Sequence, residues 1–150
     1  MNIVVIRADG SIQTRPDSTL MRRPEDFYLP DDLDSVTART CFYIKMTKAG
    51  KAVGRQFAHR YFDSVGKGVL LTCGKDITYL DWSTYIFEEC TPAGEIDPDL
   101  FNRICDEIER VTRHISLRQT DILAFENEDP VELRRGDSYA PYPFLEFSIR

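Results

Sequence analysis

Several features that would identify common functional classes are missing from this 150-residue sequence. No run approaches the roughly 18 apolar residues that a membrane-spanning helix requires. Neither glycine-rich phosphate-binding pattern, G-x-G-x-x-G or G-x-x-x-x-G-K, is present, and no internal repeat or low-complexity tract occurs. The sequence therefore gives no support for a membrane span, a nucleotide-binding loop or a repeat architecture.

Closely spaced cysteines and positive charge are also lacking. The nearest two of the four cysteines, Cys90 and Cys105, are 15 positions apart, which excludes the short spacing typical of zinc sites. The formal net charge is -6 and the sequence pI is about 4.9, so the average surface repels polyanions. The first ten residues include Arg7 and Asp9 and do not resemble a signal peptide. We therefore expect reduced thiols, a cytoplasmic location, and no nucleic-acid or membrane partner.

The hydrophobic fraction, 42%, is enough for one globular domain covering residues 1–150. Within it, strands are predicted by β-branched runs or by alternation of apolar and polar residues. The predicted strands cover residues 2–7, 41–47, 68–73, 121–125, 131–133 and 144–149, with a short edge strand at 27–29. Residues 14–34 otherwise contain three prolines and are predicted to form connections.

Two helices are predicted. Between residues 54 and 66, Phe57, Ala58, Tyr61 and Phe62 follow a helical spacing. The second helix begins after Asp97, an N-cap residue followed by a first-turn proline. Many strands with two helices, in no regular alternation, predict an α+β fold that is mainly β.

The order of several segments resembles the fumarylacetoacetate hydrolase superfamily. Residues 15–20 (RPDSTL) resemble its K-P-x-S/T stretch, and residues 57–65 resemble the helix that follows its metal-binding strand. Residues 68–76, 112–123 and 145–150 are similar to later strands and the closing helix of that family. The resemblance implies a mixed β-roll like the C-terminal domain of fumarylacetoacetate hydrolase, truncated at the N-terminal lid, and an assembly that is a homodimer or a heteromer with a paralogue.

The resemblance also implies chemistry that this sequence does not support. Family members act on oxo-acids with a divalent ion, which an E-x-E motif and an aspartate on the next strand hold through carboxylate oxygens. In the corresponding register the E-x-E positions carry Arg39 and Cys41, and the aspartate position carries Leu70. A guanidinium is permanently charged and offers no acceptor atom. We therefore expect no metal cofactor and no metal-dependent catalysis.

Two functions remain open at this stage. In the first, the protein is a non-catalytic binding or regulatory subunit, with Arg15, Arg39, Cys41 and Lys75 as the residues that bind a small carboxylate. Such a subunit could also pair with an active paralogue through the family's dimer surface. In the second, it is a metal-independent hydrolase, lyase or tautomerase acting on an oxo-acid such as an acylpyruvate. A nucleophilic Cys41 with a pKa lowered by Arg39 is a further hypothesis.

Overall fold

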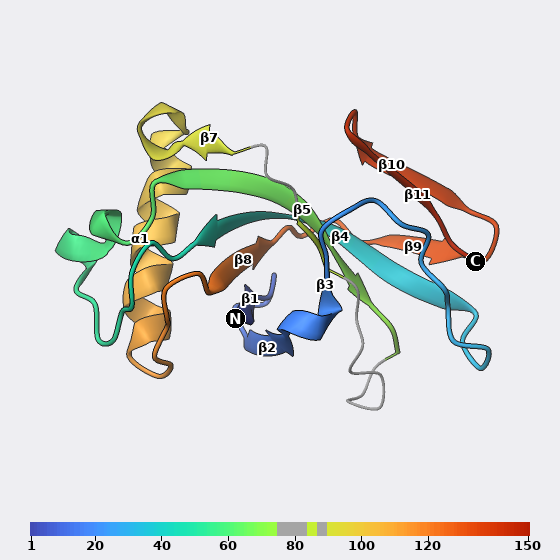
Figure 1. Cartoon of the computed structure of the whole chain (residues 1–150), viewed down its shortest axis with the longest axis horizontal. Coiled ribbons are helices and arrows are strands. Elements are labelled where there is room, and N and C mark those ends of the chain that lie inside the picture. Colours follow the sequence, from blue (N-terminus) through green and yellow to red (C-terminus); the bar gives the residue numbers. More distant parts are fainter. Residues whose placement is uncertain (75–83, 87–89) are drawn as a thin grey trace.

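The computed structural model describes residues 1–74, 84–86 and 90–150, and shows strands of a curved sheet with one long helix beside them (Figure 1). The strands are β1 (Asn2–Ile6), β2 (Ile12–Pro16), β3 (Leu20–Met21), β4 (Ser35–Lys45), β5 (Ser64–Thr72), β6 (Thr84–Ile86), β7 (Thr91–Pro92), β8 (Ile122–Glu126), β9 (Val131–Arg134), β10 (Ser138–Tyr142) and β11 (Leu145–Ser148). The helical segments are α1 (Pro98–Thr112) and the short 3-10 helices η1 (Asp17–Thr19), η2 (Arg55–Arg60) and η3 (Ala93–Glu95).

The main sheet is mixed. Its strand order is β2-β1-β8-β4-β5-β6-β3, with β7 paired to β5 and β9 paired to β4, while β10 and β11 form a separate hairpin. The pairs β1–β8 and β3–β6 are parallel, and the other pairs are antiparallel. The predicted α+β class with mainly β structure is confirmed.

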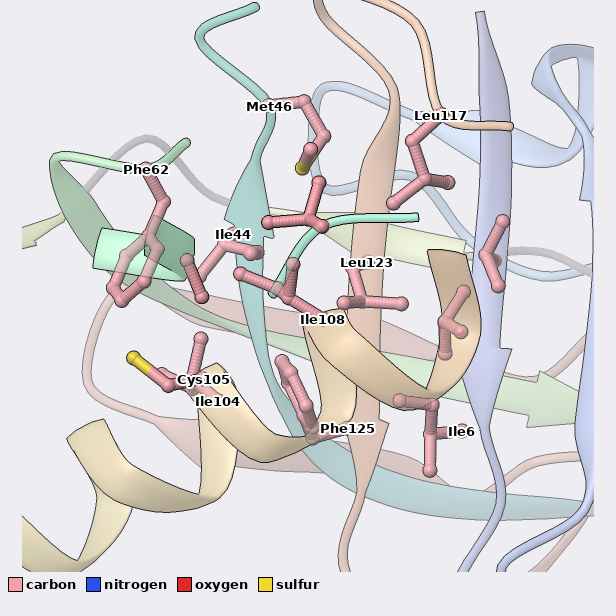
Figure 2. Packing of buried hydrophobic residues seen from close by; sticks show 14 of the residues in the cluster. Ile6, Ile44, Met46, Phe62, Ile104, Cys105, Ile108, Leu117, Leu123 and Phe125 are labelled. Atoms are coloured by element: carbon pink, nitrogen blue, oxygen red, sulfur yellow. The ribbon is translucent and has the colours of Figure 1, made fainter. Parts of the chain in front are cut away.

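Alternation along β4 separates the two faces of this sheet. The even-numbered residues of β4 face the outer, convex side of the sheet, which α1 and the β10–β11 hairpin cover. Ile44 packs against the residues beneath α1, and Val36 packs beneath the β10–β11 hairpin (Figure 2 shows the cluster under α1). Odd-numbered residues such as Cys41 and Tyr43 face the concave side, where they join side chains from β1, β5, β6 and β8. We call this concave side the inner face.

The helix α1 forms where the sequence predicts it. The Asp97 side chain accepts a hydrogen bond from the Asp99 amide at 3.1 Å, and Pro98 occupies the first turn, where no intrahelical donor is needed. Ile104, Ile108 and other apolar residues of one stripe are buried against the sheet. Among the described residues, no helix is long and apolar enough to span a membrane.

Some predicted boundaries differ from those observed. The helix expected over residues 54–66 is the shorter η2, because Ser64 already begins β5. The strand expected over 41–47 begins earlier, at Ser35, and residues 27–29 contribute only an isolated bridge between Phe27 and Ile149. Residues 14–16, predicted to be part of a connection, belong to β2, and β10 was not predicted.

Candidate functional site on the inner face

The three positions that the resemblance assigns to metal ligands lie together. Arg39 and Cys41 are two residues apart on β4, and Leu70 on β5 is the direct cross-strand partner of Arg39. Residues two apart on a strand, and direct cross-strand partners, point to the same face of a sheet. All three positions therefore face the concave side at the middle of β4.

Glu126 is the carboxylate at this site. It ends β8, pairs with Cys41 across the ladder, and is only 2% exposed. Its Oε1 lies 3.5 Å from the Arg39 Nε and accepts a hydrogen bond from the Ala8 amide at 3.3 Å, while Oε2 lies 3.5 Å from the Arg7 Nε. Oε2 is buried and has no hydrogen-bond partner among the described residues. Glu126 is therefore held mainly by two arginines.

Arg15 crosses the inner face. It lies on β2 and is 1% exposed, and its guanidinium donates to Thr84 Oγ1 at 3.1 Å on β6 and to Thr72 Oγ1 at 3.2 Å on β5. Burial lowers the Arg15 pKa to about 10, partly offset by the nearby charge of Glu126, so the guanidinium stays charged at neutral pH. Arg15 thus links two distant parts of the sheet through its curved interior.

Arg39 also anchors the segment that follows β8. Its Nη1 donates to the carbonyl oxygens of Asn127 at 3.2 Å and Glu128 at 3.0 Å. The Asn127 side-chain amide donates to Thr40 Oγ1 at 2.8 Å, and the Asn127 backbone amide donates to the Thr40 carbonyl. This segment is therefore fixed to β4.

These positions do not provide the ligands of a divalent cation. A guanidinium, a buried thiol and an aliphatic chain supply no oxygen donor, whereas Mg²⁺ and Ca²⁺ require several. The adjacent carboxylate, Glu126, is already engaged by two cationic side chains. Within the described ranges, no group of three or more His, Cys, Asp or Glu side chains is arranged to hold a metal ion.

The hypothesis of a nucleophilic Cys41 is wrong. The thiol is 1% exposed, and burial raises its pKa to about 12, against the smaller opposing influence of Arg15. A thiol with such a pKa is protonated at neutral pH, and the thiolate is the reactive form. Burial likewise raises the Cys73 pKa to about 11.

Cysteine reactivity therefore follows burial. On brief exposure of the native protein to iodoacetamide near pH 7.5, we expect alkylation at the exposed Cys90 and none at Cys41, Cys73 or Cys105, which are buried. Peptide mass spectrometry identifies the modified positions, and the same treatment in urea should modify all four. Labelling of native Cys41 at a rate comparable with Cys90 would contradict this picture.

The structure brings together three of the four site residues that the sequence predicted. Arg15, Arg39 and Cys41 do come together on the inner face, whereas Lys75 lies outside the described residues. Arg7 and Glu126 were not predicted, although each is a charged residue that directly follows an apolar run in the sequence. Glu126 also continues the inward-facing alternation of β8, so a carboxylate facing the interior was predictable.

A cavity among the described residues lies elsewhere. It has a volume of about 550 Å³ and is lined by residues at the end of β4, the start of β5 and the turn before β8, including Tyr43, Asp63 and Gln119. Arg15, Arg39 and Cys41 do not line it. In the arginine cluster, Arg39 and Arg7 are partly exposed, through 23% and 32% of their side chains.

A curved mixed sheet, with one helix and a hairpin on its outer face and charged residues on its inner face, places this chain among the mixed β-rolls. No protein-family model matches the sequence, and no curated protein matches it. Solved structures do match over 99% of this chain. They show that the chain has the fold of the fumarylacetoacetate hydrolase superfamily.

Three of these structures illustrate the match. A protein from Yersinia pestis CO92 assigned to the fumarylacetoacetate hydrolase family has 14% identity and a TM-score of 0.77, with 92% of that chain covered. The 5-carboxymethyl-2-hydroxymuconate delta-isomerase of Mycobacterium smegmatis has 13% identity and a TM-score of 0.79, with 78% covered. Fumarylpyruvate hydrolase of Pseudomonas aeruginosa, solved with Mn²⁺ and pyruvate, has 8% identity and a TM-score of 0.71, with 89% covered.

Proposed function

We propose that this chain is a cytoplasmic, non-catalytic relative of the fumarylacetoacetate hydrolases that binds a small carboxylate on its inner face and acts as a binding or regulatory subunit. One observation carries the proposal: Arg39, Cys41 and Leu70 occupy the shared face where the resemblance expects oxygen ligands. A permanent cation at such a position disfavours a second cation and favours an anion.

The charge balance of the cluster supports an anionic ligand. Arg7, Arg15 and Arg39 contribute three positive charges and Glu126 one negative charge, so the four side chains together carry +2. The chain as a whole carries -6, which makes this a local reversal of sign. Arg7 and Arg39 are the partly exposed members, and we propose that they contact the ligand from the solvent side.

The proposed partners follow the family resemblance. Homodimers are usual in the superfamily, so we propose that this chain pairs with a second copy or with an active paralogue. In a mixed assembly, a subunit without metal ligands supplies contacts or carboxylate sensing, and its partner supplies the chemistry.

Calorimetric titration of the full chain tests the proposed function. We expect pyruvate or oxaloacetate to bind without added metal and with the same affinity in EDTA, and Mg²⁺ or Mn²⁺ alone to give no binding heat. Arg39→Ala should weaken carboxylate binding at least about tenfold, because a charge-assisted pair is lost. Arg39→Lys keeps the charge but not the planar fork, so its carboxylate affinity should lie between those of the unmodified chain and Arg39→Ala.

A matched control separates this effect from general loss of charge. Arg113 forms an ion pair with Glu109 of α1 on the outer face. Arg113→Ala therefore removes one arginine charge and one ion pair away from the inner face. Its carboxylate affinity should equal that of the unmodified chain. Stoichiometric Mg²⁺ or Mn²⁺ binding, turnover of these acids, or equal affinity in Arg39→Ala would each refute the proposal.

A further inference from the structure

A second basic site lies on the loop between β4 and β5. A cavity of about 290 Å³ opens there, and it is lined by Lys48, Lys51, Ala52, Val53, Gly54, Phe57, Arg60 and Tyr61. Three of these residues are basic and none is acidic. The cavity is formed by one continuous segment and shares no lining residue with the inner face.

The three cations of this cavity differ from their basic neighbours. On the same side of the molecule, Arg55, Arg110 and Arg113 each form an ion pair with a carboxylate of α1. Lys48, Lys51 and Arg60 form no ion pair within the described part of the chain. In a chain of net charge -6, three neighbouring cations left without a carboxylate constitute a local positive field.

Aromatic rings hold two of these cations in place. The Lys48 Nζ lies 4.7 Å from the centroid of the Tyr61 ring, and the Arg60 guanidinium carbon lies 5.1 Å from the centroid of the Phe57 ring. Cation–π contacts of this kind restrict long side chains without neutralising them. The charges are therefore partly positioned before any ligand arrives, which reduces the entropy cost of binding.

The loop itself is fixed to the rest of the fold. The Ala52 amide donates to the Thr112 carbonyl at 2.9 Å, and the Val53 amide donates to the Thr112 hydroxyl at 3.0 Å. Ala52 adopts φ of 50°, a conformation that residues with side chains rarely occupy. Val53 is buried in the core beneath α1. The basic side chains thus project from an anchored backbone.

We propose that this cavity binds a small phosphate-bearing molecule. A terminal phosphate group carries a charge of about −1.5 to −2 at pH 7. It accepts hydrogen bonds from both point-like ammonium groups and the guanidinium fork, which matches two lysines and one arginine. The cavity lies near the lower end of the size range of ligand pockets, so the ligand is small. The overall negative charge of the chain disfavours long polyanions such as nucleic acids.

Calorimetry with pyrophosphate as the probe tests this proposal. We expect the full chain to bind pyrophosphate, and Lys48→Gln combined with Lys51→Gln to weaken binding at least about tenfold, since two charge-assisted contacts are lost. Arg60→Gln alone should weaken it severalfold. All three side chains are exposed, so circular dichroism should show an unchanged fold.

The matched control removes equal charge elsewhere. Arg23 and Lys67 are exposed, and Arg23→Gln combined with Lys67→Gln changes the net charge equally. This variant should keep its pyrophosphate affinity, and so should Arg39→Ala, which separates this site from the inner face. No binding of pyrophosphate, or equal weakening in the Arg23 and Lys67 control, would overturn the proposal. Loss of affinity in Arg39→Ala alone would place the phosphate at the inner face and also overturn it.

Discussion

Replacing Arg15 with alanine is expected to lower the free energy of unfolding by about 4 kcal/mol, a large share of the stability of a typical domain. Two effects add. The hydroxyls of Thr72 and Thr84 lose their buried donor, and the vacated volume of a side chain that is 1% exposed leaves a cavity. Urea unfolding followed by circular dichroism measures the change.

Two variants define the origin of that loss. Arg15→Met retains most of the packing but none of the hydrogen bonds, so its loss should be intermediate. Arg23→Ala, at an exposed position, should change stability by less than about 0.5 kcal/mol. A loss below about 1 kcal/mol in Arg15→Ala would mean that the link between β2, β5 and β6 contributes little to the fold.

Glu126→Ala is expected to lower the free energy of unfolding by about 3 kcal/mol and to make the protein responsive to added carboxylate. Removing one member of a buried ion pair leaves the others uncompensated, and the partial exposure of Arg7 and Arg39 keeps the loss near the lower end of the usual range. Acetate can then occupy the vacated volume between the guanidiniums. At about ten times its dissociation constant it should restore about 1.4 kcal/mol.

The rescue has a defined chemical signature. Chloride at equal ionic strength should not restore stability, and acetate should stabilise the unmodified chain less than Glu126→Ala, because Glu126 already occupies the volume between the guanidiniums. Glu126→Gln keeps the volume occupied, so acetate should not rescue it. Equal responses of Glu126→Ala to acetate and chloride would show that the added salt only screens the repulsion among the arginines and that no specific anion site exists.

The sequence predicted most of the central structure because burial leaves a clear pattern. The apolar run that becomes β1, the apolar residues of β5, and the Asp97 cap of α1 each follow from local chemistry. Among the strands that were not predicted, β2 and β10 contain Pro16 and Pro141. Proline is tolerated there because β2 lies at an edge of the main sheet and β10 belongs to a hairpin with an irregular register.

The candidate site was predictable only in part. The positions of Arg39, Cys41 and Leu70 followed from the register of two adjacent strands. The partners of Arg15 did not, because Thr72 and Thr84 are reached only through curvature of the whole sheet, and sequence periodicity does not encode curvature. The nucleophilic Cys41 hypothesis is wrong because burial raises the thiol pKa by more than the nearby arginine lowers it.

The parallel pairing of β1 with β8 has a consequence for biosynthesis. The Asn2 amide donates to the side chain of Asp121, 119 positions later. Among the described strands, β1 has β2 as its only other neighbour in the sheet. On the ribosome, the β1–β2 hairpin therefore remains an incomplete edge until residue 126 has emerged. Such distant pairing favours slow completion of the sheet and exposes an apolar strand in the meantime.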